Sequence, residues 1–272
     1  MPTITVNGVE LFYEDTGGSG EPILFSHGLL WNTALFAPQV AALKDRYRCI
    51  AYDHRGQGQS ADGEGSEIGM DLLTDDAVAL IAALGLEKVH FCGLSMGGFV
   101  GMRLAARFPH LVRSLILCET SADAEPEANV PKYRRLNFAA RWLGLRFVVA
   151  KVMPILFGQT SLTDASRSAE KAAWRKQLEG NRRSIWRAVN GVINRAAVID
   201  ELPRISAPTM VIVGDEDVAT TPAKAQRIAK AISNARLVRI PKAGHSSTVE
   251  QPKAVNAAML EFLGTLARRE EQ

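Results

Sequence analysis

Short apolar runs alternate with longer amphipathic stretches along most of the chain. Runs such as Pro22–Ser26, Arg48–Tyr52 and Val89–Cys92 are short, rich in apolar residues and followed by glycine or polar residues, as buried strands are. The stretch Asp71–Leu84 has apolar residues at helical spacing and stops at Gly85. This alternation predicts an α/β fold with a mostly parallel sheet flanked by helices.

Two segments depart from this rhythm. At the N-terminus, two strand-like runs flank Asn7-Gly8, a dipeptide typical of tight hairpin turns, and so predict an antiparallel pair. Residues 122–202 contain no clear strand and are helix-like throughout. We therefore expect one α/β core, formed by residues 1–121 and 203–272, that is interrupted by a helical cap of residues 122–202.

The composition and charge of the chain argue against several classes of protein. The 272 residues are 47% hydrophobic and 22% charged, which is typical of a globular domain with a core large enough to need no structural metal. A net charge of +3 argues against a nucleic-acid partner. No apolar run of 18 residues occurs, so we expect no membrane partner. The N-terminus lacks a secretory pattern, and the odd count of three cysteines predicts reduced thiols and a cytoplasmic location.

A candidate nucleophile lies in Gly93–Gly97, which matches G-x-S-x-G between a predicted strand and a predicted helix. A tight strand-to-helix turn would project the Ser95 hydroxyl away from the sheet. Glycine is needed two residues away on either side because the turn is crowded. The N-terminus of the following helix favours the negative charge that develops when such a serine reacts.

A serine hydroxyl needs a neighbouring base. Of five histidines, His245 alone follows a late strand and precedes the last helix, which places it at the carboxyl end of the sheet. We predict that His245 is the general base. The other four fall in a loop, a turn, a strand and a helix end, and are predicted to be structural: His27, His54, His90 and His110.

An acid is needed to orient the imidazole. Three carboxylates follow the strand that ends at Gly214, and we favour Asp217. Asp215 and Glu216 are the local alternatives, and Glu119, just after an earlier strand, is the distant one.

An oxyanion hole needs two preorganised N–H groups. The residue after the nucleophile supplies one, from the backbone of Met96. The loop that begins at His27-Gly28 is expected to supply the other from the backbone of Leu29. The side chains of Leu29 and Met96 are not the donors.

Together these motifs resemble the α/β-hydrolase superfamily over essentially the whole chain. The order Ser95, Asp217, His245 is that of its catalytic triad. The resemblance implies the α/β-hydrolase fold with a helical cap over the active site. The motifs that carry it are His27-Gly28, Tyr52–Ser60, Gly93–Gly98, Gly214–Asp217 and Gly244-His245.

The resemblance also narrows the reaction. The tight turn that holds Ser95 is called the nucleophile elbow in this superfamily. Related dehalogenases and epoxide hydrolases have an aspartate there, so a serine favours reactions that transfer an acyl group. The Gly-Leu-Ser-Met-Gly-Gly elbow is similar to that of 3-oxoadipate enol-lactonases and their esterase and lactonase relatives, and acyl-homoserine lactonases share the plan. Residues 122–202 lack the Arg-Trp-Phe cap motif associated with enol-lactonases.

The predicted cap is basic and rich in tryptophan. Residues 122–202 hold 14 Lys or Arg against 8 Asp or Glu and three of the four tryptophans. The positive charge would steer an anionic or polar substrate, or else form a solvated face. The apolar residues near Gly158 would line an acyl pocket or pack the cap on the core. The candidate substrate-binding residues are Trp31, Trp142, Met153 and Phe157.

These features predict a serine hydrolase that cleaves carboxylic esters and lactones through an acyl-enzyme, with acyl-homoserine lactones among its candidate substrates. The partner is the small-molecule ester or lactone, and no cofactor or metal is implied. A 3-oxoadipate enol-lactonase is the alternative within this class. A small-molecule sensor with an intact but slow triad is the alternative outside it.

Overall fold

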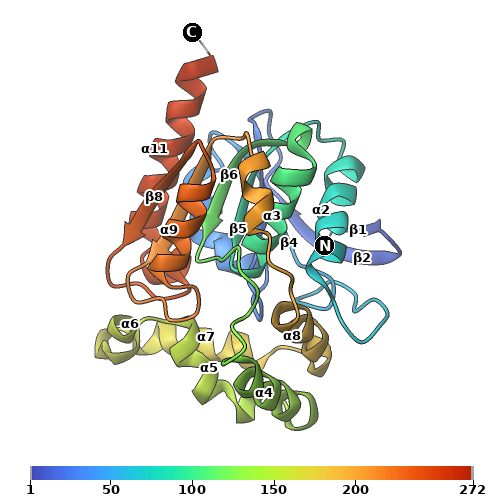
Figure 1. The fold of residues 1–272 in the computed structure, drawn as a ribbon, viewed down its shortest axis with the longest axis vertical. Coiled ribbons are helices and arrows are strands. Elements are labelled where there is room, and N and C mark those ends of the chain that lie inside the picture. Colours follow the sequence, from blue (N-terminus) through green and yellow to red (C-terminus); the bar gives the residue numbers. More distant parts are fainter. Residues whose placement is uncertain (1, 271–272) are drawn as a thin grey trace.

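Eight strands form one sheet in the computed structural model, which describes residues 2–270 (Figure 1). Their spatial order is β1-β2-β4-β3-β5-β6-β7-β8. From β4 to β8 all neighbouring strands are parallel. The strands are β1 (Thr3–Val6), β2 (Val9–Asp15), β3 (Pro22–Ser26), β4 (Arg48–Tyr52), β5 (Val89–Leu94), β6 (Val112–Cys118), β7 (Thr209–Gly214) and β8 (Ala235–Ile240).

The predicted hairpin at the N-terminus is confirmed. Strands β1 and β2 are antiparallel, and Val6 faces Val9 across the turn. Asn7 and Gly8 have φ angles of 45° and 73°, the left-handed conformation that a two-residue hairpin turn requires. Strand β2 also pairs antiparallel with β4, which joins the hairpin to the parallel part of the sheet.

Helices cover both faces of the sheet, which confirms the predicted α/β fold. Helices α2, α3 and α9 lie on one face, where α3 packs against β5 and β6 and α9 against β7 and β8 (Figure 1). Helix α1 packs against α11 on the other face. The core helices are α1 (Ala37–Leu43), α2 (Met70–Ala83), α3 (Met96–Arg107), α9 (Pro222–Ala231), the short α10 (Ser247–Glu250) and α11 (Pro252–Glu270).

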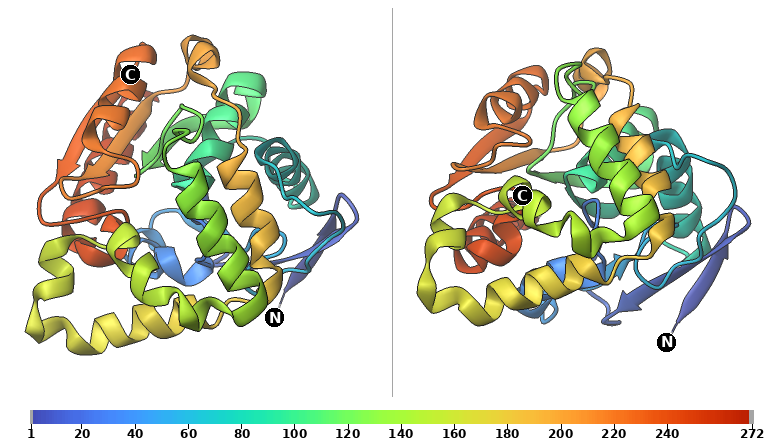
Figure 2. Two further views of the ribbon diagram at one scale, coloured as in Figure 1. Left: turned by 60° about the horizontal axis from the view of Figure 1, so that its bottom comes forward. Right: turned by 90° about the horizontal axis from the view of Figure 1, so that it is seen from below.

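Five helices follow β6 and precede β7, and none of the described residues between these strands forms a strand. They gather at one end of the molecule, beyond the carboxyl ends of the strands (Figures 1 and 2). These helices are α4 (Val130–Leu143), α5 (Val149–Leu156), α6 (Gln159–Thr163), α7 (Ser168–Glu179) and α8 (Trp186–Ile193).

The helical insertion is held against a loop of the core. Arg182 and Arg187 donate hydrogen bonds to the carbonyls of Ser60 and Gly63, at 2.6 and 2.9 Å. Gly191 lies so close to the carbonyl of Ile68 that a β-carbon there would collide with it. These contacts fix one end of the insertion over the sheet.

A buried carboxylate ties the turn after β4 to the loop after β3. Asp53 is fully buried, and its two oxygens accept the N–H groups of Thr33 and Gln59, each at 2.7 Å. Gly58, at a φ of 53°, passes so close to this carboxylate that a side chain would displace it. The turn motif seen in the sequence therefore has a structural function: it anchors the loop that includes Leu29.

We expect Asp53→Ala to lower the free energy of unfolding by about 1–3 kcal/mol, because the buried Thr33 N–H loses its acceptor. Urea denaturation would measure the change. Glu14→Ala, at an exposed position, is the control and should shift the free energy by less than about 0.5 kcal/mol. Equal values for the two variants would contradict the anchoring role of Asp53.

Candidate active site

Ser95 occupies a strained turn between β5 and α3. Its φ and ψ are 54° and −108°, which a residue with a side chain rarely adopts. A β-carbon at Gly97 would collide with the carbonyl of Ser26, and one at Gly93 would collide with the backbone of Gly97. Glycine at both positions lets the turn close, and the hydroxyl of Ser95 faces the cavity described below.

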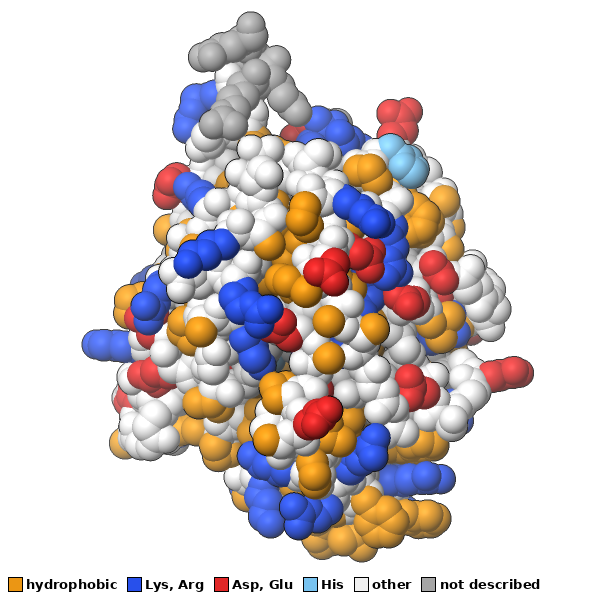
Figure 3. All heavy atoms as spheres, in the orientation of Figure 1, with side chains coloured by type: hydrophobic (Ala, Val, Ile, Leu, Met, Phe, Trp, Pro, Cys, Tyr) orange, Lys and Arg blue, Asp and Glu red, His pale blue; other side chains and the backbone are white. Residues whose placement is uncertain are grey.

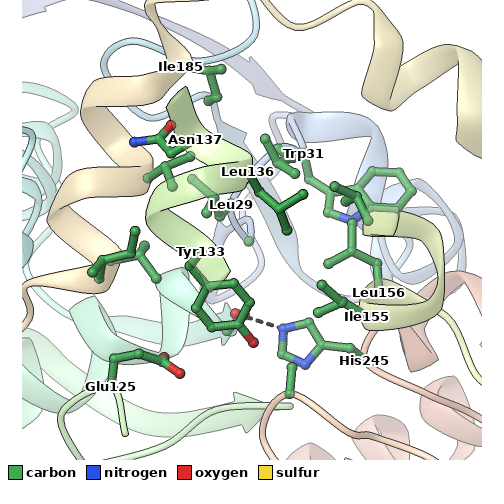
Figure 4. A pocket seen from close by; sticks show the side chains of 18 of the residues that line it. Leu29, Trp31, Glu125, Tyr133, Leu136, Asn137, Ile155, Leu156, Ile185 and His245 are labelled. Carbon is green, nitrogen blue, oxygen red and sulfur yellow. Dashed lines mark hydrogen bonds between the residues drawn. The ribbon is translucent and has the colours of Figure 1, made fainter. Parts of the chain in front are cut away.

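Three side chains from separate strand ends form one hydrogen-bonded chain. His245 Nε2 lies 2.9 Å from Ser95 Oγ, and His245 Nδ1 lies 2.9 Å from Asp217 Oδ2. Figure 4 shows the His245 ring, and the dashed line from its nitrogen marks this hydrogen bond. The structure therefore brings together the three residues that the sequence analysis singled out.

Asp217 is held in place by its own turn. Its Oδ1 accepts the N–H groups of Ala219 and Thr220 at 2.8 and 2.9 Å, and its Oδ2 accepts the Thr220 hydroxyl at 2.7 Å. Burial raises the pKa of the Asp217 carboxyl, but the charge of a protonated His245 and these hydrogen bonds outweigh it. The net pKa lies below its usual value, so Asp217 stays ionised beside His245.

The other three candidate acids lie elsewhere. Asp215 pairs with Arg239 at 2.6 Å, and Glu216 accepts the N–H of Thr160 at 2.8 Å. Glu119 is fully buried, and no hydrogen bond joins it to His245 in the described residues. Burial raises the pKa of Glu119 well above the usual value, so it is neutral rather than a counter-ion for His245.

The two predicted oxyanion-hole donors belong to segments next to the serine: Leu29 lines the same cavity as Ser95, and Met96 follows Ser95 in the chain. In the described part of the chain, the N–H groups of Leu29 and Met96 donate no hydrogen bond to a backbone carbonyl outside the helices and strands. Met96 is the first residue of α3. The Gln57 side chain joins the two segments, because its Oε1 accepts the N–H of Leu30 at 2.9 Å and its Nε2 lies 3.6 Å from Met96 Sδ. Gln57 lies in the turn after β4, to which the sequence analysis assigned no chemistry.

His27 and His54 brace the loop that includes Leu29. His27 Nδ1 lies 2.7 Å from the carbonyl of Gly28, and its Nε2 accepts the N–H of His54 at 3.0 Å. His54 Nε2 lies 2.9 Å from Ser26 Oγ. Burial, and then the neighbouring His27, lower the pKa of His54 well below its usual value, so it remains neutral.

Glu250, which the sequence analysis missed, ties the loop of His245 to the helical insertion. One carboxylate oxygen accepts the N–H groups of Gly244 and Ser246, at 2.9 and 3.2 Å. The other accepts the N–H of Gly158 at 2.8 Å. Burial raises the pKa of this carboxyl, although the three N–H groups oppose the shift. Glu250 lies 92 residues from Gly158, so no local pattern indicates the contact.

An apolar cavity of about 150 Å³ opens beside Ser95 and His245 (Figure 4). An apolar cavity of this size holds a molecule such as benzene. Helix α4 lines it with residues at helical spacing, and so does α5. The lining residues from these two helices are Tyr133, Leu136, Asn137 and Ala140 of α4 and Val152, Ile155 and Leu156 of α5.

The structure corrects three of the four predicted substrate-binding residues. Trp31 lines the cavity. Trp142 does not, because it lies on the outer face of α4 with 57% of its surface exposed. Met153 is half-buried in α5 and is not among the residues that line the cavity. Phe157 is buried and stacks on Trp174 with ring centroids 4.4 Å apart, so it packs the insertion instead of facing the cavity.

The charged groups of the cavity wall neutralise each other. Arg195 Nη1 lies 2.9 Å from Glu125 Oε2, and both side chains are almost fully buried. The guanidinium also donates to the carbonyl of Val192 at 2.7 Å and lies 4.5 Å from the centre of the Phe99 ring. The positive charge of the insertion therefore does not place an unpaired cation at this point of the cavity.

Within residues 2–270 there is no group of three or more His, Cys, Asp and Glu side chains suited to a metal ion. No helix in that range is both long and apolar enough to cross a membrane.

Comparison with protein-family models matches residues 21–252 to the alpha/beta hydrolase fold family. The chain belongs to this family. The match includes the strands and loops that supply Ser95, Asp217 and His245.

Individual relatives extend over almost the whole chain. The 3-oxoadipate enol-lactonase 2 of Acinetobacter baylyi is 32% identical, over 94% of this chain and 94% of its own length. A protein of Agrobacterium fabrum provisionally named carbamate hydrolase RutD is 27% identical, over 91% and 95%. The structure of a thermophilic esterase from Thermogutta terrifontis, with malate bound, is 31% identical, covers 97% of both chains and has a TM-score of 0.88.

We expect Glu250→Gln to loosen the loop around His245, because an amide N–H₂ would face a backbone N–H in place of a carboxylate oxygen. Amide hydrogen exchange at Gly244 and Ser246 should become at least tenfold faster. Glu261→Gln, at an exposed position of α11, is the matched control and should leave both amides unchanged. Wild-type protection in Glu250→Gln would show that the carboxylate does not position this loop.

Proposed function

We propose that the protein is a serine hydrolase of carboxylic esters and lactones. The observation that carries the proposal is the hydrogen-bonded chain Asp217–His245–Ser95, with both distances 2.9 Å. Family membership and the names of the relatives support it, because an esterase and an enol-lactonase are among them.

In the proposed reaction, Ser95 Oγ attacks the carbonyl carbon of the ester while His245 Nε2 takes its proton. The N–H groups of Leu29 and Met96 bind the negative oxygen that forms. His245 then gives the proton to the leaving alcohol, and an acyl group remains on Ser95. Water attacks this acyl-enzyme with His245 again as the base, which releases the acid and restores the serine.

Asp217 acts on His245 rather than on the substrate. Its carboxylate accepts a hydrogen bond from the Nδ1–H of His245, which keeps the proton on Nδ1 and leaves Nε2 free to accept the proton of the serine. It also stabilises the positive imidazolium that forms during each step. Because two backbone amides and a hydroxyl hold this carboxylate, it needs little rearrangement as the charge develops.

The cavity favours an uncharged acyl group of moderate size. Its wall is apolar apart from a few polar groups, and its buried ion pair leaves no net charge there. A lactone requires no new catalytic group, because it is an ester whose leaving group stays attached to the acyl chain. Acyl-homoserine lactones join a lactone ring to an apolar acyl chain, and that chain matches the apolar wall of the cavity.

A 3-oxoadipate enol-lactone is the second candidate substrate, favoured by the 32% identity to the Acinetobacter baylyi enzyme of that name. Its acid product is a dicarboxylate, so the cavity would have to accept an anion. The pairing of Arg195 with Glu125 and the absence of an Arg-Trp-Phe motif in the insertion weigh against this substrate.

We expect Ser95→Ala to abolish hydrolysis of p-nitrophenyl butyrate and labelling by a fluorophosphonate probe, because the attacking oxygen is lost. Mass spectrometry should place the probe of the wild-type protein on Ser95. Ser184→Ala, on the insertion, is the control and should be labelled like the wild type. Labelling that survives in Ser95→Ala would overturn the assignment of the nucleophile. If each wild-type molecule hydrolyses only about one ester molecule and then stops, the protein is a sensor and not an enzyme.

We expect Asp217→Asn to reduce kcat by up to about 10⁴-fold, because the amide favours the wrong tautomer of His245. Asp215→Asn is the matched control and should reduce kcat less than tenfold, since its carboxylate pairs with Arg239. Glu119→Gln should have a similarly small effect. A larger loss of kcat in Glu119→Gln than in Asp217→Asn would show that the acid of the triad is Glu119, after β6, and not Asp217.

We expect kcat/KM for p-nitrophenyl esters to peak at acyl chains of about four to eight carbons, because the cavity is apolar but small. Leu136→Phe should shift the peak toward shorter chains. Hexanoyl-homoserine lactone should be opened to its acid more rapidly than the dodecanoyl homologue. Ester hydrolysis without any lactone opening across that series would limit the protein to linear esters.

A further inference from the structure

The helical insertion exposes four large hydrophobic side chains close together. Between 54% and 67% of each is exposed, and the only other large hydrophobic side chain so exposed in the described residues is Val218. Figure 3 shows hydrophobic and basic side chains side by side at the lower end of the molecule, where Figure 1 places α4. The four residues are Phe138, Trp142, Leu143 and Phe147.

Phe138, Trp142 and Leu143 belong to α4, Phe147 follows that helix, and none of the four lines the cavity. The face of α4 that includes Leu136 and Ala140 lines the cavity, whereas Phe138 and Trp142 lie one turn apart on the outer face. The outer face of a solvated surface helix is normally polar. Helix α4 is therefore apolar on two sides, and only the inner side has a partner in the structure.

Positive charge surrounds these side chains. Residues 128–163 contain six Lys or Arg and no Asp or Glu. All six are exposed, and within the described residues none of them forms an ion pair. They are Lys132, Arg134, Arg135, Arg141, Arg146 and Lys151.

Guanidinium groups and aromatic rings alternate across this surface. Arg141 lies 5.2 Å from the ring centre of Trp142 and 4.1 Å from that of Trp186, and Arg146 lies 4.7 Å from that of Phe147. A shallow hollow beside them is lined by Arg134 and Arg141 together with asparagine side chains of α4 and α8. Two guanidiniums and amide groups around one hollow suit a phosphate group.

We propose that this surface binds the face of an anionic lipid bilayer. We name it the α4 surface and define it as Arg134, Phe138, Arg141, Trp142, Leu143, Arg146 and Phe147. Aromatic and aliphatic side chains enter the boundary between headgroups and acyl chains, while the surrounding Lys and Arg attract anionic headgroups. This mode needs no membrane-spanning helix, so it departs from the sequence-based expectation that membranes are not a partner.

A second copy of the chain fits this surface less well. A two-fold dimer would place the α4 surface of one copy on that of the other. Each brings the same unpaired positive charges, which repel at short range. An anionic lipid surface instead supplies opposite charge and an apolar layer in the same place.

The test is co-sedimentation with vesicles of phosphatidylcholine alone or with 30 mol% phosphatidylglycerol. We expect the wild-type protein to bind the anionic vesicles at least tenfold more tightly than vesicles of phosphatidylcholine alone. We also expect 0.5 M NaCl to weaken the binding to anionic vesicles. Arg134→Gln/Arg146→Gln should weaken it about 25-fold, at about fivefold for each charge removed. Phe138→Ser/Phe147→Ser should weaken it at least tenfold.

Lys230→Gln/Lys253→Gln, which removes two exposed charges from α9 and α11, is the matched control and should bind anionic vesicles like the wild type. All variants should keep the wild-type circular dichroism and hydrolysis of soluble p-nitrophenyl butyrate, since the changed residues lie outside the cavity. Equal binding to both kinds of vesicle, or equal losses in the control, would overturn the proposal. So would a wild-type dimer that Phe138→Ser/Phe147→Ser makes monomeric.

Discussion

The strained turn at Ser95 is the constraint on which the rest of the site depends. It closes only because Gly97 lets the backbone of α3 approach the carbonyl of Ser26, with no space left for a side chain. Strand β6 stabilises the turn from the other side: the carbonyl of Cys118 accepts the N–H of Ser95 at 2.8 Å, and the Thr120 hydroxyl donates to the carbonyl of Ser95 at 2.9 Å. The position of the serine hydroxyl is thus set by three neighbouring strands and not by the turn alone.

Features that depend on local sequence could be predicted. Apolar runs and turn residues indicate the strands and the N-terminal hairpin, and parallel strands bring their carboxyl ends to one edge, where Ser95 and His245 meet. Local sequence does not single out the acid, because three carboxylates follow β7. The structure distinguishes them by orientation: the amides after Asp217 turn its carboxylate toward His245, whereas Asp215 faces Arg239.

The cavity and the contacts that support the site could not be predicted in the same way. Helix α4 has apolar residues on both sides, so its pattern does not tell which side faces inward. Residue type alone predicts that Trp142 lines the pocket, whereas it lies on the outer side. Glu250 and Gln57 act through hydrogen bonds between segments that are distant in the chain. Such pairings leave no periodic signal, because each partner is a single polar residue in an otherwise ordinary loop or helix.

The buried pair of Arg195 and Glu125 has a consequence for how a guest enters the cavity. Opposite charges 2.9 Å apart leave this part of the wall without net charge, so an incoming molecule meets no unpaired charge there. Its affinity then follows its distribution between oil and water, at about 0.8 kcal/mol for each methylene that fits. Ionic strength, which screens the exposed basic side chains of the insertion, has little influence on that step. Binding of a small molecule in the cavity and the positive charge of the outer surface are therefore independent of each other, although the same few helices provide both.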